Sequence, residues 1–202
     1  MLTRGQPTSL LLAVIFLALL AISGWEVVST DGPKVVERRA RGDGFIEVRV
    51  STVTDIRPIH VANAFWARRT PASKAIKKYE LIRQDDVEKI VYQQLRLPIV
   101  KDRDYTVRIE RYTDAAAGLY QFNSKCRSDL GPPPNDEHVR VTDCTAQYSV
   151  ELGADGRTHV TYTAFANAAG RLPIWIVNAL APKAASEVLD KMLEEARGLG
   201  PI

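Results

Sequence analysis

The chain has few of the residues that most often bind metals or act as catalytic nucleophiles. Its 202 residues include three histidines and two cysteines, and the histidines are too widely dispersed for a zinc motif. No Gly-x-Ser-x-Gly elbow and no glycine-rich phosphate loop occurs. The sequence therefore offers no catalytic constellation, and we expect no metal, no cofactor and no enzyme activity.

Long runs of basic residues are also missing. No stretch contains more than two consecutive lysines or arginines, and the net charge at pH 7 is only +3. Proteins that bind DNA or RNA usually concentrate their basic residues on one face. We therefore expect no nucleic-acid partner.

A single long apolar run lies near the N-terminus. Residues 10–22 are all apolar, Arg4 precedes them, and Ser23 and Gly24 follow. As a helix the run would span roughly 20 Å, which is short of the roughly 30 Å core of a bilayer. This order is typical of a signal peptide, so we expect residues 1–24 to direct export to a periplasm or the cell exterior. The alternative is that residues 10–22 anchor the chain in a membrane.

The rest of the chain, a domain of residues 25–198 with a tail at 199–202, is dominated by alternating apolar and polar residues. This period of two predicts strands, and the short turns between them favour an antiparallel meander. The expected strands are Lys34–Ala40, Phe45–Val53, Tyr79–Arg83, Val87–Leu97, Tyr105–Tyr112, Leu119–Cys126, Val139–Leu152 and Thr158–Ala166.

Helical spacing appears in three places. Residues 59–67, after Pro58, predict a short helix, and Thr70-Pro71 can begin a second one that runs to about Lys77. A long amphipathic helix is expected from near Pro173 to about Arg197. Pro182 should kink this helix or divide it in two.

The two cysteines flank a triple-proline loop. Pairing Cys126 with Cys144 aligns the apolar rows of two strands, and a slip of one residue would separate them. The aligned pairs are Phe122 with Tyr148 and Tyr120 with Val150. We therefore predict a disulfide, with two unpaired thiols as the alternative.

Three motifs, in this order, resemble the StAR-related lipid-transfer (START) domain family. They are Trp25-Glu26 with Val35-Val36-Glu37-Arg38, Ile90-Val91-Tyr92 with Pro98 and Asp102-Arg103-Asp104-Tyr105, and the segment from Gly170 to Asn178. The chain departs from the family pattern at Ser73 or Lys74, where a tryptophan is common, and at Ile99 and Val100, where an aromatic residue is common. The resemblance implies an α+β helix-grip fold, in which a curved antiparallel sheet carries two short inserted helices and a long C-terminal helix over its concave face.

The resemblance also implies a function. The expected role is binding, and transfer, of one lipid or other hydrophobic small molecule in an internal tunnel, by a monomer that touches membranes transiently. The alternatives are a helix-grip enzyme of the polyketide cyclase or aromatase kind, and an interaction module whose cavity is vestigial.

Candidate binding residues follow from their positions in the expected elements. The expected cavity residues are Val61, Phe65, Tyr120, Phe122, Tyr148, Trp175, Val177 and Ala181. For each of them, ordinary core packing is the alternative. Arg108 and Asn178 are candidates for contact with a polar headgroup.

Overall fold

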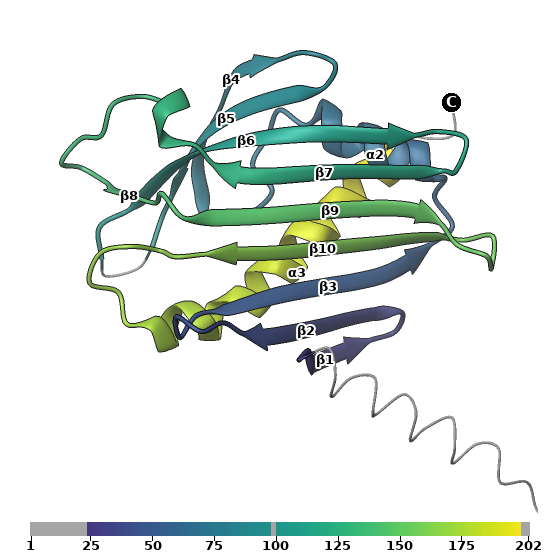
Figure 1. Ribbon diagram of the computed structural model, residues 1–202, viewed down its shortest axis with the longest axis horizontal. Coiled ribbons are helices and arrows are strands. Elements are labelled where there is room, and N and C mark those ends of the chain that lie inside the picture. The colour runs from purple at the N-terminus through teal and green to yellow at the C-terminus, as the bar shows by residue number, and fades with distance from the viewer. Residues whose placement is uncertain (1–23, 98–99, 199–202) are drawn as a thin grey trace, which may run out of the picture.

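The computed structural model describes residues 24–97 and 100–198, which form one ten-stranded sheet with two helices on one face (Figure 1). The strand order is β1-β2-β3-β10-β9-β7-β6-β5-β4, with β8 beside β6. The strands are β1 (Glu26–Asp31), β2 (Lys34–Ala40), β3 (Ile46–Thr54), β4 (Ile76–Gln84), β5 (Glu88–Leu95), β6 (Arg103–Asp114), β7 (Leu119–Cys126), β8 (Val139–Arg140), β9 (Cys144–Leu152) and β10 (Thr158–Ala166). A short 3-10 turn, η1 (Ser128–Leu130), follows β7. The expected leader and tail lie outside the described residues, apart from Gly24.

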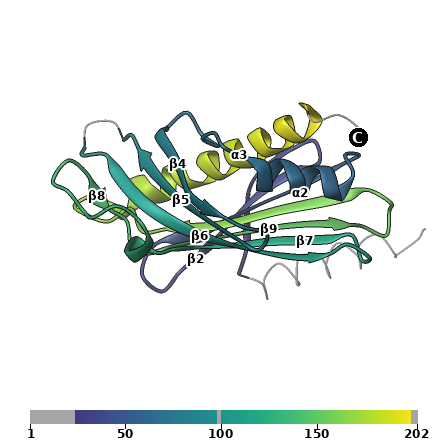
Figure 2. The ribbon, with the colours of Figure 1, turned by 90° about the horizontal axis from the view of Figure 1, so that it is seen from above.

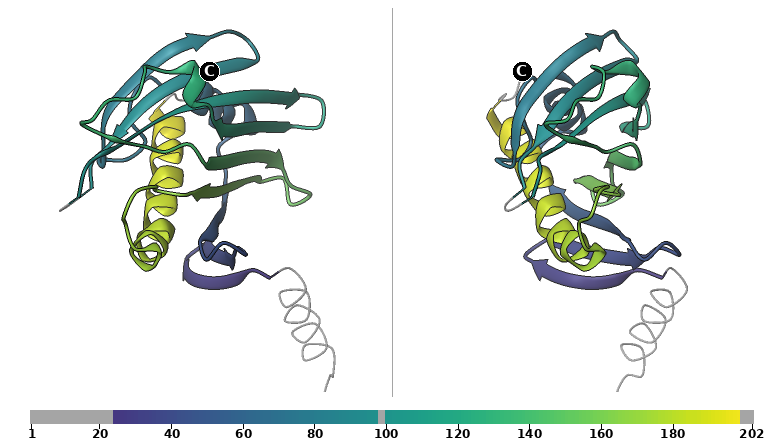
Figure 3. Two further views of the ribbon diagram at one scale, coloured as in Figure 1. Left: turned by 60° about the vertical axis from the view of Figure 1, so that its left-hand side comes forward. Right: turned by 90° about the vertical axis from the view of Figure 1, so that its left-hand side faces the viewer.

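The sheet curves around its helices, so that one face is concave (Figures 2 and 3). Along β3, Val48 and Val50 on this inner face are buried, because alternate side chains of a strand point to opposite faces. Helix α2 (Pro58–Ala67) packs against β7 and β9, and α3 (Ile174–Gly198) packs mainly against α2, β3, β10 and β2. The predicted α+β helix-grip fold is confirmed.

The predicted disulfide and register are also present. Cys126 and Cys144 are bonded, with their Cα atoms 5.1 Å apart. Strands β7 and β9 pair in the expected register, with Phe122 opposite Tyr148 and Tyr120 opposite Val150. The bond therefore ties together two neighbouring strands of the sheet.

The second short helix is a wrong prediction. Residues 70–75 form turns and bends, and Ile76 already begins β4, where it pairs with Leu95. The amide of Arg96 donates to the carbonyl of Ala75, so sheet pairing takes the backbone groups that a helix would need. One inserted helix, α2, is present instead of two.

Three further elements differ from the prediction. Strand β1 was not expected, and it pairs with β2 through a turn in which Gly32 has φ +55°. The expected strand Val139–Leu152 is split, because Val139 and Arg140 pair in parallel with the start of β6 instead. Helix α3 continues through Pro182 without dividing.

Neither helix in the described part of the chain is both long enough and apolar enough to span a bilayer. Across the same residues, no group of three or more histidine, cysteine or acidic side chains is placed to hold a metal ion.

Candidate ligand-binding site

An aromatic cluster fills the part of the interior between α2 and strands β7 and β9. The ring of Phe65, from α2, lies 4.5 Å from that of Phe122 and 4.2 Å from that of Tyr148, centroid to centroid. Trp66 stacks on Phe122 at 5.8 Å. Five predicted cavity residues, each at most 7% exposed, belong to this packed core: Val61, Phe65, Tyr120, Phe122 and Tyr148. This part of the interior is occupied by the protein's own side chains.

The opposite end of the inner face is covered less completely. The C-terminal ends of β5 and β10 meet there with the N-terminal ends of β6 and β9. Seven inner-face side chains in this region are only partly buried, and we call them the open end: Tyr79, Gln93, Leu95, Tyr105, Ala146, Tyr162 and Ala164. The main contacts of α2 and α3 are with other strands than β4, β5 and β6. The open end is therefore the part of the inner face that the two helices cover least.

The phenols of the open end are sheltered from bulk water. Burial raises the pKa of Tyr162 to about 12, and it raises the pKa of Tyr105 further. The Tyr105 hydroxyl donates to Gln93 Oε1 at 3.2 Å, and the Tyr162 ring stacks on Tyr148 at 4.3 Å. Both side chains extend from the inner face of the sheet and pack against its core.

Helix α3 changes character along its length. All of its buried residues lie from Ala185 onwards, and none lies among residues 174–184. The predicted cavity residues Val177 and Ala181 are partly buried and lie in this first part, whereas Trp175 is 72% exposed. The first part of α3 therefore forms a loosely packed cover, and Trp175 faces outward.

The two candidate headgroup contacts have other partners. Asn178 Oδ1 accepts from the amide of Ile46 at 3.2 Å, and its Nδ2 donates to the carbonyl of Gly44 at 3.0 Å. Asn178 thus fastens α3 to the start of β3. Arg108 lies on the face of β6 opposite the core, where it pairs with Glu88 and, at 3.0 Å, with Glu110.

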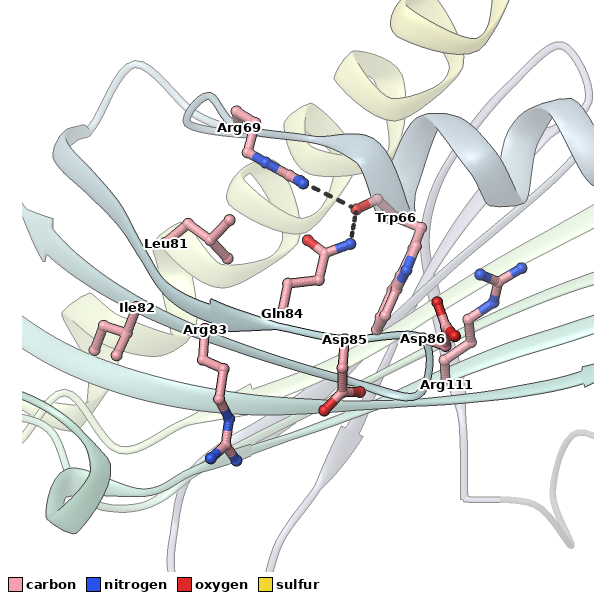
Figure 4. Close-up of a pocket in the computed structure, with 9 residues that line it drawn as sticks. All are labelled: Trp66, Arg69, Leu81, Ile82, Arg83, Gln84, Asp85, Asp86 and Arg111. Atoms are coloured by element: carbon pink, nitrogen blue, oxygen red, sulfur yellow. Dashed lines mark hydrogen bonds between the residues drawn. The ribbon is translucent and has the colours of Figure 1, made fainter.

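A depression of about 570 Å³ lies outside the aromatic cluster, between the end of α2 and the β4–β5 turn (Figure 4). Its lining residues are Trp66, Arg69, Leu81, Ile82, Arg83, Gln84, Asp85, Asp86 and Arg111. The side chains of Arg69 and Gln84 both donate to the carbonyl of Trp66. These hydrogen bonds cap the C-terminal end of α2. Charged and amide groups make up most of its wall, so it suits polar groups better than an alkyl chain.

Five of the residues predicted from the sequence lie in the packed core, and the residues of the open end were not among those predicted. Tyr105 and Tyr162 lie in the same alternating rows as the predicted residues, and Tyr162 is directly opposite Tyr148. That pairing could have been predicted by extending the register of β7 and β9 to the next strand.

A curved antiparallel sheet that grips a long C-terminal helix over a partly open aromatic interior defines the helix-grip class of proteins. Within this class, the family model described as "START domain" matches residues 9–199. The chain belongs to the START domain family. START domains typically bind lipids or other hydrophobic ligands.

Solved structures agree on the fold. A STAR-related lipid transfer protein from Xanthomonas axonopodis is 20% identical, with a TM-score of 0.72 over 86% of this chain and 99% of its own. Human StAR-related lipid transfer protein 5 is 15% identical, with a TM-score of 0.69 over 96% of this chain and 98% of its own. A Streptomyces aromatase/cyclase is 15% identical, with a TM-score of 0.51 over 77% of this chain and 98% of its own. No curated protein matches the sequence.

Proposed function

We propose that this protein binds one lipid or other hydrophobic molecule at the open end of its inner face and carries it without chemical change. The observation that supports this most directly is the set of inner-face side chains at this end of the sheet that α2 and α3 leave partly exposed. Each methylene of a guest transferred from water to such a place gains about 0.8 kcal/mol.

The polar groups of the open end support binding rather than catalysis. They include phenols whose pKa is raised, so that they stay protonated near neutral pH and are poor general bases. Gln93, the hydrogen-bond partner of Tyr105, does not titrate. These groups can orient a ligand by hydrogen bonds more readily than they can move protons.

Transfer to or from a membrane is proposed to involve the start of α3. Ile174, Trp175 and Leu180 are exposed there, beside the open end. Tryptophan favours the interface between lipid and water. Together with the apolar leader, this supports an exported carrier that contacts membranes transiently.

The direct test is to purify the protein from its producing cells, extract it with organic solvent and identify the bound molecules by mass spectrometry. We expect close to one lipid per chain, also visible as an added mass in the native spectrum. A protein that carries no lipid and does not bind a neutral pyrene-labelled lipid would contradict the proposal.

A further inference from the structure

Arg68, just after α2, is a buried cation with an unused donor. It is 8% exposed, and its Nε donates to Glu195 Oε2 of α3 at 2.8 Å. Its Nη2 is covered by neighbouring atoms and has no hydrogen-bond partner. A buried charged donor without a partner is costly, so such a group needs an explanation.

Positive charge exceeds negative charge around this position. Lys89, 2% exposed, extends from the inner face of β5 and donates to the carbonyls of Arg68 at 2.7 Å and Trp66 at 3.2 Å. Burial, together with the nearby charges of Arg69 and Arg68, lowers the pKa of Lys89 to about 7. The carboxylate of Glu195 has the opposite effect and raises the pKa of Lys89. The group thus brings together the charged guanidinium groups of Arg68 and Arg69, a lysine that is only partly protonated near pH 7, and the single carboxylate of Glu195.

The charge of Arg68 also reaches the phenols that face the interior. Burial dominates the raised pKa values of Tyr79, Tyr148 and Tyr162, while Arg68 lowers all three. The Tyr79 hydroxyl donates to the carbonyl of Arg68 at 3.2 Å. Tyr148 belongs to the packed core, and Tyr79 and Tyr162 belong to the open end. Arg68 therefore stands at the inner boundary of the open end.

We propose that the ligand is an acidic amphiphile, whose carboxylate or phosphate group binds the guanidinium of Arg68 while its alkyl chain occupies the open end. This rests on the proposed function and adds the chemical class of the ligand. A guanidinium binds carboxylate and phosphate through paired N–H donors. The ligand's acid group takes the free Nη2 donor after a local side-chain shift, and its negative charge offsets the cationic excess.

The test compares hexadecanoic acid, hexadecyl phosphate and the uncharged hexadecan-1-ol by isothermal titration with delipidated protein. We expect at least one acidic ligand to bind about tenfold or more tightly than the alcohol, because hydrogen bonds to charged groups are the strong ones. If the phosphate binds best, the ligand is a phosphate monoester, and if the carboxylate binds best, it is a free acid.

The variant Arg68→Met with Glu195→Gln removes the ion pair without leaving a buried charge. It should lose the preference for acids while its affinity for the alcohol stays within about twofold. The matched control, Arg127→Met with Asp129→Asn, removes an exposed pair at 2.7 Å near η1 and should keep the preference. Glu195→Gln alone leaves Arg68 in place without its carboxylate partner and should strengthen acid binding, which gives a second test if the double variant does not fold.

Equal affinity for acid and alcohol would overturn the acidic-ligand proposal, as would a preference that persists in the folded double variant or weaker acid binding by Glu195→Gln. The proposed function would survive each of these results. If none of the three ligands binds, the acidic-ligand proposal fails, and the proposed function fails with it only if the purified protein also carries no lipid and does not bind the pyrene-labelled lipid.

Discussion

Lys89 illustrates how a single residue can hold a helix end at a cost in stability. Its ammonium group caps the last carbonyls of α2, where a cation is favourable, but it does so in a buried position. Burial lowers its pKa from 10.5 to about 7, so the folded protein releases this proton far more readily than the unfolded chain does. The stability of the protein should therefore depend on pH through this one group.

We expect the free energy of unfolding to rise with pH between about pH 7 and pH 10, by up to about 1.4 kcal/mol per unit from Lys89. In this range the unfolded chain binds the proton and the folded protein does not. Below about pH 7 both states bind it, and the contribution to the slope disappears. Urea unfolding of the wild type and Lys89→Met across this range measures the difference. Parallel pH profiles for the two proteins would refute the assignment.

Individual residues were predictable where one strict pattern fixed their direction. Phe122 and Tyr148 were placed correctly because alternation and register leave one choice of face. The directions of the Trp175 and Arg108 side chains were harder to predict. A residue in the first turn of a helix can point toward the core or toward solvent, and a charged residue in a strand can form an ion pair or contact a ligand. The partners of Arg108 come from β5 and from its own strand, and only the folded sheet brings Glu88 beside it.

At the scale of elements, α3 consists of two parts with different packing. From Ala185 onwards it contributes several buried side chains to the core, among them Leu189 and Met192, which are 0% exposed. The preceding part holds Pro182, which lacks the amide that would bond to the preceding turn. Its link to the sheet includes the two hydrogen bonds of Asn178.

The two parts should differ in stability. Leu189→Ala is expected to lower the free energy of unfolding by about 2–5 kcal/mol, because it leaves a cavity in the core. Trp175→Ala should change it by less than about 0.5 kcal/mol, because that side chain is exposed. Urea unfolding measures both. Amides of residues 178–184 should also exchange with deuterium faster than those of residues 189–196, and uniform protection along α3 would contradict this division.

The elements that could be predicted were those with an unambiguous period, including most strands and both helices now seen. The prediction of a second helix was wrong because the segment after Thr70 leads into a strand. Pairing of Ile76 with β5 outweighs the helix-capping preference of Thr70. Strand β1 was missed because it is exposed at all six positions and shows no alternation. Edge strands of this kind are defined by their neighbour rather than by their own sequence.

At the scale of the whole molecule, the disulfide restricts the unfolded chain. It closes a loop between residues 18 apart in the sequence. Replacing both cysteines by alanine should lower the free energy of unfolding by about 3 kcal/mol. Urea unfolding under non-reducing conditions measures this change, and a loss below about 0.5 kcal/mol would show that the bond contributes little.

Filling the open end should separate ligand binding from folding. Ala164→Trp places a large ring among the partly exposed inner-face residues, and we expect it to weaken lipid binding by about tenfold or more through steric exclusion. Ala116→Trp makes the same change in an exposed turn and is the matched control. Titration with a neutral pyrene-labelled lipid compares them. Unchanged binding by a correctly folded Ala164→Trp variant would place the ligand elsewhere.

Because α3 follows every strand of the sheet in the chain, the ribosome makes the sheet before it makes the helix that packs on it. Leu189, Met192 and Ala196, which belong to the hydrophobic core, emerge only after all the strands. Until then the nascent chain presents its aromatic face to the surroundings, a condition that favours aggregation. A need for chaperone protection during synthesis, and loss of stability on truncations that remove these residues, follow from this order of events.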